Sequence, residues 1–259
     1  MSGWPLAATC AAIAALALGA LALVQQRRLR DLRERLKGVA FELERLQQTC
    51  SRFAPPPVLE RLINEEGEVA AERKVVTALF ADLVGYTALS GQLEPAVLAR
   101  VLNGYFQRVS DAIAEHHGYV STFLGDGILA YFGAMEPNPW QCNDAARAAL
   151  AMRAALSAYN EELAKAGLPR LAIGVGLHRG SGLAGMIGSR ERREYGFVGR
   201  TVNLAARVQA LTREHNVDIL LTEEVRSQLD GSFELRAMPP AELKGITGKV
   251  ATFALLGNA

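Results

Sequence analysis

Cysteine is scarce in this sequence, and net charge is nearly absent. The three cysteines, Cys10, Cys50 and Cys142, lie far apart and have no partners at metal-ligand spacing. This argues against a disulfide framework and a zinc site, and favours a reducing compartment. The 28 Lys and Arg residues nearly balance the 27 Asp and Glu residues, so no overall positive charge favours nucleic acid as a partner. Half of the 259 residues are hydrophobic, which excludes a disordered chain.

Charged side chains are also absent from the first 26 positions. Residues 4–24 are almost entirely apolar, and as a helix they would span about 30 Å, the thickness of a bilayer core. Six basic residues follow within residues 27–37. We therefore expect a transmembrane helix at 4–24 in the inner membrane, with the rest of the chain in the cytosol. A cleaved signal peptide is the alternative, but no basic residues precede this long apolar run.

A heptad pattern follows the apolar run. Apolar residues recur at alternating steps of three and four, at Leu29, Leu32, Leu36, Val39, Leu43, Leu46 and Cys50. This narrow stripe between charged flanks predicts a parallel dimeric coiled coil over residues 27–52. A single amphipathic helix that packs on its own domain is the alternative. Prolines 55–57 break the helix, so we expect a linker over residues 53–73.

The remaining residues, 74–256, predict one α+β domain. Buried strands are expected at 75–82, 171–178, 182–187, 218–221 and 250–255, and a hairpin at 119–124 and 128–132. Helical spacing covers 94–117, 142–165 and 201–213. This order favours a largely antiparallel sheet with helices over one face.

Two aspartates in this domain are candidate metal ligands. Asp82 ends the first strand, and Asp126 lies in the turn of the hairpin. Strands of one sheet can bring both carboxylates to a single edge, where hard divalent ions such as Mg²⁺ or Mn²⁺ find the oxygen ligands they prefer. Two such ions on paired carboxylates are a common arrangement for in-line attack at phosphorus. Each aspartate alone is unspecific, since Gly-Asp-Gly is usually a plain turn.

Three segments resemble one known family. They are FADLVGYT at 80–87, FLGDGILAYFG at 123–133 and VGRTVNLAAR at 198–207. In this order and spacing they are similar to the catalytic domain of the class III nucleotidyl cyclases, the adenylate and guanylate cyclases. The resemblance covers about residues 53–256 and implies a ferredoxin-like α+β fold.

The resemblance also implies roles for individual residues. Asp82 and Asp126 match the two aspartates that bind two divalent metal ions. Asn203 matches the asparagine that orients the ribose, and Arg207 the arginine that stabilises the transition-state phosphate. Lys244 falls where the family places a lysine on the terminal phosphates. Independently of the resemblance, the helix start that follows Asp82 is expected to offer backbone N–H groups to phosphate oxygens, in Val84, Gly85, Tyr86 and Thr87.

The family works as a head-to-tail dimer whose sites combine residues of both chains. The resemblance therefore implies a homodimer, in agreement with the heptad pattern. Asn203 and Arg207 lie four residues apart, on one face of the expected helix.

The base-recognition positions depart from the family's pattern. Adenylate cyclases usually have a lysine where this chain has Thr122, and an aspartate or threonine where it has Gly196; guanylate cyclases often have a glutamate at the first position. Neither residue here distinguishes the purines. ATP is the expected substrate because it is the commonest in the family, and GTP, UTP and CTP stay open. A catalytically silent regulatory domain is a second reading. A diguanylate cyclase is a third reading, but the Gly-Gly-Asp/Glu-Glu-Phe signature of those enzymes does not occur at the hairpin of this chain.

Overall fold

The computed structural model describes residues 25–26, 28–30, 32–43, 45, 71–189, 193–243, 245–246 and 248–259. The chain divides into two compact units, Met1–Leu59 and Glu60–Ala259. Among the residues described, no helix combines the length and the apolar character needed to cross a bilayer. The run 4–24 lies outside the described residues, so the membrane span there stays a prediction.

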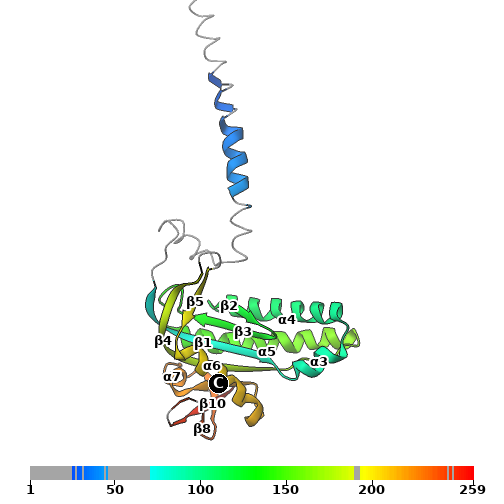
Figure 1. Cartoon of the computed structure of the whole chain (residues 1–259), viewed down its shortest axis with the longest axis vertical. Coiled ribbons are helices and arrows are strands. Elements are labelled where there is room, and N and C mark those ends of the chain that lie inside the picture. Colours follow the sequence, from blue (N-terminus) through cyan, green and yellow to red (C-terminus); the bar gives the residue numbers. More distant parts are fainter. Residues whose placement is uncertain are drawn as a thin grey trace, which may run out of the picture. The chain divides into compact units, whose positions relative to one another are not determined.

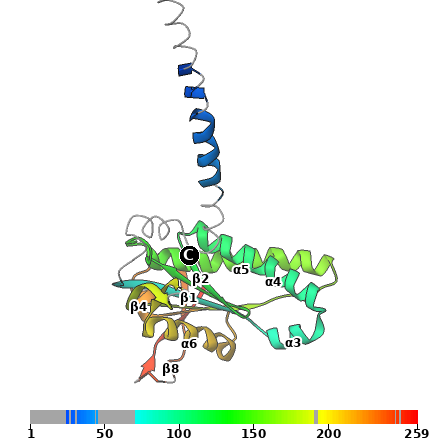
Figure 2. The ribbon, with the colours of Figure 1, turned by 45° about the horizontal axis from the view of Figure 1, so that its top comes forward.

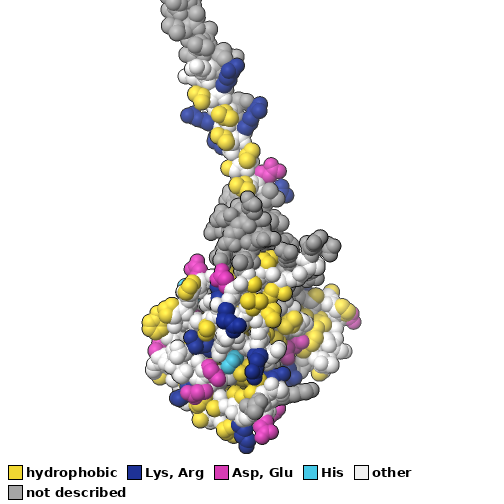
Figure 3. Space-filling model, turned by 60° about the vertical axis from the view of Figure 1, so that its left-hand side comes forward, with side chains coloured by type: hydrophobic (Ala, Val, Ile, Leu, Met, Phe, Trp, Pro, Cys, Tyr) yellow, Lys and Arg dark blue, Asp and Glu magenta, His cyan; other side chains and the backbone are white. Residues whose placement is uncertain are grey.

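The described residues of the first unit are helical (Figure 1). Hydrophobic and basic side chains alternate along this helix (Figure 3). The described heptad positions are 53% to 64% exposed, at Leu29, Leu32, Leu36, Val39 and Leu43. Leu46 and Cys50 lie outside the described residues. The helical prediction is confirmed for this segment, and the pairing of two such helices stays a prediction.

The second unit is built on an eight-stranded sheet (Figure 1). Seven strands follow the order β2-β3-β1-β4-β6-β10-β7, and β5 pairs with the far end of β4. Only β4 and β6 run parallel among these pairs, so the prediction of a largely antiparallel sheet is confirmed. The strands are β1 (Glu72–Leu83), β2 (Tyr119–Leu124), β3 (Gly127–Phe132), β4 (Ile173–Gly188), β5 (Arg193–Val198), β6 (Ile219–Thr222), β7 (Phe233–Ala237) and β10 (Thr252–Asn258). A separate two-stranded sheet joins β8 (Ala241–Glu242) to β9 (Lys249–Val250).

Two long helices cover one face of this sheet. They are α4 (Pro95–Glu115) and α5 (Gln141–Lys165), with the short α3 (Tyr86–Gln92) before them. Alternate residues of β1 and β4, among them Leu79 and Leu177, join Tyr105 of α4 and Met152 of α5 in one fully buried core. Burial of these large apolar side chains is the main stabilising contribution to the domain.

The third long helix lies on the opposite face, so the prediction that the helices cover one face is wrong for it. This helix is α6 (Arg200–His215), and Figure 2 shows it across the sheet from α4 and α5. The reason lies in alternate glycines of β4. A Cβ on Gly176 would lie 2.3 Å from the Gln209 backbone nitrogen, and one on Gly174 would lie 2.3 Å from the Thr212 hydroxyl. Without side chains at these positions, the backbones of α6 and β4 come into close contact.

The strands predicted at 171–178 and 182–187 form the single strand β4, which corrects that expectation. Its partner β1 pairs with it without interruption, from Leu83 opposite Ile173 to Glu72 opposite Ala184. The ladder therefore holds the polar residues 179–181 in an extended conformation. β5 and β7 were not predicted.

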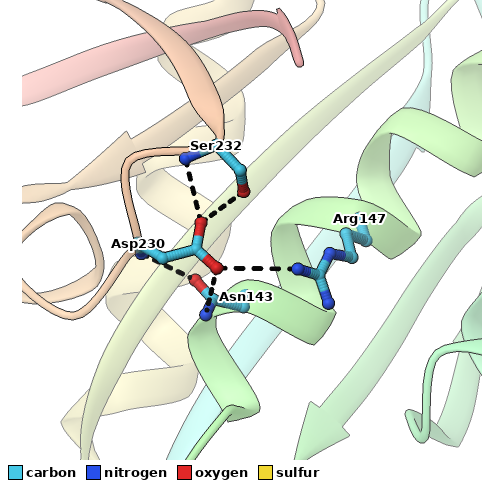
Figure 4. A network of polar contacts seen from close by, with 4 residues as sticks. All are labelled: Asn143, Arg147, Asp230 and Ser232. Carbon is cyan, nitrogen blue, oxygen red and sulfur yellow. Dashed lines mark hydrogen bonds and ion pairs between the residues drawn. The ribbon is translucent and has the colours of Figure 1, made fainter. Parts of the chain in front are cut away.

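A polar network ties α5 to the loop before β7 (Figure 4). Asn143, which is only 1% exposed, donates to the Asp230 carboxylate at 3.1 Å and accepts from the Asp230 N–H at 3.1 Å. The N–H and the hydroxyl of Ser232 both donate to the other carboxylate oxygen, and these bonds lower the pKa of Asp230. Arg147 lies 3.6 Å from the same carboxylate. The loop is thus fixed by one buried amide and one carboxylate.

Replacing Asn143 with alanine should lower the free energy of unfolding by about 1–3 kcal/mol, because it removes two hydrogen bonds from a buried position and leaves their partners unsatisfied. Urea denaturation would measure the loss. The control is Gln107→Ala, which removes one exposed side-chain bond on α4 and should change stability by less than about 0.5 kcal/mol. Equal stability of both variants would show that the network contributes nothing.

Candidate active site

The structure brings the two predicted metal-binding aspartates together. β1 pairs with β3, so that Ala81 lies opposite Ile128. Leu124 pairs with Gly127 across the hairpin, which leaves Gly125 and Asp126 as a two-residue turn. Gly125 has a φ of 66°, a conformation that favours glycine in such turns. Asp82 Oδ1 lies 3.4 Å from a Cβ built on Gly127, so both carboxylates share this edge of the sheet.

The electrostatics of the pair show how close the carboxylates are. Partial burial raises the pKa of Asp82 to about 6, and a hydrogen bond with Asp126 and the charge of that carboxylate add to the rise. The charge of Arg213 opposes it. Beneath the pair, burial and the two carboxylate charges also raise the pKa of the Tyr105 hydroxyl in α4. Two neighbouring carboxylates of like charge disfavour each other's ionised form, so a cation at this edge would stabilise the pair.

One cation already contacts the pair. The Arg213 guanidinium, on the last turn of α6, donates to Asp82 Oδ2 at 3.0 Å and to the Leu83 carbonyl at 3.2 Å through the same Nη2 nitrogen. The side chains of Arg213 and Asp82 are 52% and 25% exposed. The sequence analysis did not identify Arg213, because its partner is 131 residues away along the chain.

The donor set at this edge fits a hard divalent cation. Two carboxylates and the Leu83 carbonyl converge there, and Mg²⁺ usually takes one or two carboxylates together with water and substrate phosphates. A guanidinium occupies the Asp82 oxygen that such an ion would use. No cluster of three or more His, Cys, Asp or Glu side chains that could hold a metal occurs in the described part of the chain. Water molecules or substrate oxygens would therefore complete the coordination of a metal ion held by the pair.

The loop after Asp82 contains the four backbone N–H groups that were predicted to contact phosphate, and one of them already has an acceptor. The Val84 N–H already donates to the Ala172 carbonyl at 2.8 Å, so it is not free to bind a phosphate. Gly85, with a φ of 76°, turns the chain into α3, which begins at Tyr86. The first N–H groups of a helix have no acceptor within it. The prediction of phosphate contacts therefore stays open for the N–H groups of Gly85, Tyr86 and Thr87. It is withdrawn for the N–H group of Val84.

Helix α6 carries the other predicted catalytic side chains. Asn203 is exposed and Arg207 partly buried. Both terminal nitrogens of Arg207 lie 3.6 Å from a Cβ built on Gly245, so the guanidinium lies against the loop that follows β8. Lys244 is in this loop but lies outside the described residues. The structure thus places Arg207 against the loop that contains Lys244. The position of the Lys244 side chain stays a prediction.

The same helix keeps these residues away from the aspartates of their own chain. Arg213 follows Arg207 by six residues and Asn203 by ten, which corresponds to about 9 Å and about 15 Å along the helix axis. At about 100° per residue, Arg213 points about 120° away from Arg207 and about 80° away from Asn203. Since Arg213 contacts Asp82, Asn203 and Arg207 are aimed elsewhere.

The two predicted base-recognition positions lie on β2 and β5. Tyr131 of β3 connects these strands. Its hydroxyl donates to the carbonyl of Phe197, next to Gly196, at 3.3 Å. The Tyr131 hydroxyl also hydrogen-bonds Ser121, next to Thr122. Burial raises the pKa of Tyr131 to about 12. Tyr131 was not singled out from the sequence, although it belongs to the second of the three segments that resemble the family, at 123–133.

The surroundings of Thr122 and Gly196 leave room for another group at both positions. The Thr122 hydroxyl donates only to the carbonyl of its neighbour Phe123, at 3.5 Å, so it is available to another group. Among the described residues, a Cβ on Gly196 would meet only the end of Ile187, at 3.7 Å. Space for a side chain exists there, so the fold does not require glycine at this position.

Comparison with known proteins identifies the fold and its relatives. The family model for the "Adenylate and Guanylate cyclase catalytic domain" matches residues 68–257. The adenylate cyclase of Anabaena cylindrica is 37% identical over 206 residues, which are 75% of this chain and 40% of that protein. Adenylate cyclase 1 of Rhizobium meliloti is 28% identical over 211 residues, 81% of this chain and 32% of that protein. The chain thus spans less than half the length of these relatives.

Solved structures give the same result. The guanylyl cyclase Cya2 is 30% identical, with a TM-score of 0.67 over 74% of this chain and 96% of that one. The adenylyl cyclase CyaB from P. aeruginosa is 26% identical, with a TM-score of 0.68 over 73% of this chain and 96% of that one. Both nucleotide specificities therefore occur among its structural relatives.

Proposed function

Because the chain belongs to the adenylate and guanylate cyclase catalytic domain family, we propose that it converts a nucleoside triphosphate into the 3′,5′-cyclic nucleotide and pyrophosphate. The observation that carries this proposal is the meeting of Asp82 and Asp126 at one edge of the sheet, where partial burial, together with the hydrogen bond and the charge of Asp126, raises the pKa of Asp82 to about 6. Carboxylates placed in this way hold divalent metal ions and bring them to phosphates.

In the proposed reaction the ribose 3′-oxygen attacks the α-phosphorus. A new P–O bond forms, the bond to the β-phosphate oxygen breaks, and the hydroxyl proton passes to solvent. Two Mg²⁺ or Mn²⁺ ions held by Asp82 and Asp126 would supply Lewis acidity to the attacking hydroxyl and to the phosphates. Asn203 orients the ribose. Arg207, with its planar and permanently charged donor group, stabilises the charge that develops on the phosphoryl oxygens.

The terminal phosphates have their own proposed contacts. Lys244 is placed by the sequence on the loop against which Arg207 lies, so both cations can face the same anionic groups. N–H groups of Gly85, Tyr86 and Thr87 are the proposed contacts on the side of the aspartates. A triphosphate would thus be held from two sides, by backbone dipoles and by cationic side chains.

We propose that each site is shared between two copies of the chain. Within one chain, ideal helix geometry places Asn203 about 15 Å and Arg207 about 9 Å along α6 from Arg213, the residue that contacts Asp82. A second copy in head-to-tail orientation can place its Asp82 and Asp126 opposite them, which gives two equivalent sites in a symmetric dimer. This arrangement explains how all four side chains act on one substrate.

Two exposed surfaces support a homodimer. The described heptad positions of residues 27–52 are more than half exposed in the single chain, as expected for a helix that pairs with another. In the catalytic domain, Figure 3 shows hydrophobic side chains gathered on the side where β4 and β5 lie. Strands β1, β4 and β5 contribute large exposed side chains there, at Val75, Leu183, Ile187 and Val198. Exposed apolar patches of this kind commonly mark protein interfaces.

The proposed location is the inner membrane. The apolar run 4–24 is long enough to span a bilayer, and the basic residues directly after it favour the cytoplasmic side for residues 27–259. The substrate would then come from the cytosolic nucleotide pool. Separation of membrane and soluble fractions would test this location.

ATP is the proposed substrate because two curated relatives are adenylate cyclases. Thr122 and Gly196 do not decide between purines, since a hydroxyl can donate or accept and glycine brings no side chain. GTP is therefore the first alternative, in line with the guanylyl cyclase among the structural relatives, and UTP and CTP follow.

The proposal predicts that the full chain, given Mn²⁺ and each nucleoside triphosphate separately, forms a 3′,5′-cyclic nucleotide, with cyclic AMP as the main product. Mass spectrometry would identify the product, and an assay with EDTA in place of Mn²⁺ is the control. A dominant cyclic GMP, UMP or CMP would keep the reaction and change the substrate. No product from any of the four, in protein shown to be folded and dimeric, would favour a silent regulatory domain.

A further inference from the structure

We infer that Arg213 is an internal counter-cation that occupies Asp82 in the metal-free site and competes there with the incoming metal ion. This inference rests on the proposed function, since it assumes that Asp82 is a metal ligand. It adds a residue that neither the sequence segments nor the proposed reaction requires.

Arg213 contacts the same oxygen atoms that a metal ion would bind. One nitrogen, Nη2, donates to both Asp82 Oδ2 and the Leu83 carbonyl. These oxygens are two of the three groups that make the edge suitable for a hard cation. A metal ion on Asp82 Oδ2 and this guanidinium cannot both use the same lone-pair direction at close range, and their positive charges repel.

The position of Arg213 makes the competition an internal property of each chain. Arg213 lies six residues beyond Arg207 on α6, and α6 is held against β4 at Gly174 and Gly176. The helix therefore carries the guanidinium to Asp82 of its own chain, whereas Asn203 and Arg207 face away from it. Arg213 is thus a positioning residue for Asp82, distinct from the residues proposed to contact substrate.

The strength of the contact suits a reversible competitor. The Arg213 side chain is 52% exposed, and ion pairs this accessible to water are individually weak. A divalent ion with two carboxylates can therefore displace it. In the metal-free state the pairing still matters, because it opposes the mutual repulsion of Asp82 and Asp126. Removal of Arg213 should then tighten metal binding by about 1.5- to fivefold, the range expected for loss of a weak ion pair.

The test is a Mn²⁺ titration of the full chain without nucleotide, followed by the electron paramagnetic resonance signal of free Mn²⁺. Wild type is compared with Arg213→Ala and with Arg213→Gln, which keeps more of the side-chain volume. The matched control is Arg226→Ala, which also removes one positive charge but breaks contacts outside the carboxylate pair: an ion pair with Glu223 at 2.7 Å and a contact with the Phe253 ring at 4.9 Å. We expect both Arg213 variants to lower the Mn²⁺ Kd about 1.5- to fivefold, and the control to change it less than about 1.5-fold.

A second readout is the melting temperature with EDTA and with Mn²⁺. Without its counter-cation the carboxylate pair repels itself, so the Arg213→Gln variant should melt below wild type in EDTA. Because a ligand that binds the native state more tightly stabilises it more, Mn²⁺ should raise the melting temperature more in this variant than in wild type.

The outcomes separate the two proposals. If wild type binds Mn²⁺ no better than Asp82→Asn, the metal site and the proposed function fail together. If binding depends on Asp82 but the Arg213 variants bind Mn²⁺ with unchanged or weaker affinity, the inference is wrong and the proposed function stands. Equal tightening in Arg226→Ala would assign the effect to net charge and would also overturn the inference.

Discussion

Asp82→Asn should reduce cyclic nucleotide formation at least about 100-fold, the scale of losing one main electrostatic contribution to a phosphoryl transition state. Asparagine keeps the shape of the side chain but lacks the charge that binds a divalent ion. The fold should survive, because Asp82 is 25% exposed and its pair with Arg213 is open to solvent. Turnover with saturating Mn²⁺ and the melting temperature would be measured on the same preparation.

The control for this prediction is a second Asp→Asn exchange. Asp111 is an exposed carboxylate on α4 that accepts only from Gln107, at 2.8 Å, and it lies on the helix that covers the opposite face of the sheet from α6. Asp111→Asn should keep activity within about twofold of wild type. If Asp82→Asn also kept its activity, the two-metal assignment of Asp82 and Asp126 would be wrong.

Mixing two inactive variants should restore activity. Arg207→Ala removes the proposed transition-state cation and Asp82→Asn removes a metal ligand, so each homodimer lacks both functional sites. In a mixed dimer one site collects both substitutions and the other collects none. Random assortment makes half of the dimers mixed, each with one intact site, so an equal mixture should recover about one quarter of wild-type activity.

The mixture needs proof that subunits exchange. Co-expression with two different affinity tags, followed by purification on both in turn, isolates the mixed dimer, which should then have about half of wild-type activity. A doubly substituted chain mixed with wild type is the reference for one intact partner. Purified mixed dimers without activity would contradict sites shared between chains.

The sequence predicts the centre of this domain well, because local signals are strong there. The hairpin 119–132 combines two apolar runs with a two-residue turn whose glycine adopts a positive φ. The long helices 94–117 and 142–165 match α4 and α5 within a few residues, since their apolar periodicity is maintained over many turns. The aspartate pair depends in addition on the pairing of β1 with β3, which joins residues far apart in the sequence, such as Ala81 and Ile128.

The features that were missed depend on distant partners. In the sequence, Arg213 is a basic residue near the end of a helix, where cations are common. Only the tertiary structure shows that it contacts Asp82. The side of the sheet on which α6 packs is encoded by the alternate glycines of β4, and a search for alternating small residues at 174, 176 and 180 would have indicated it. β5 and β7 are short, and each is defined mainly by the strand it pairs with.

The close contact of α6 with β4 has a mechanical consequence. A Cβ at Gly176 would fall 2.3 Å from the Gln209 nitrogen and 2.4 Å from the Ala205 carbonyl oxygen, so no layer of side chains separates helix from strand at this point. Such a joint cannot slide or rock without a backbone clash. Helix α6 and strand β4 therefore move as one rigid unit. In the proposed dimer, a change in the gap between the two halves of a shared site would carry this whole unit, with Asn203 and Arg207 on it.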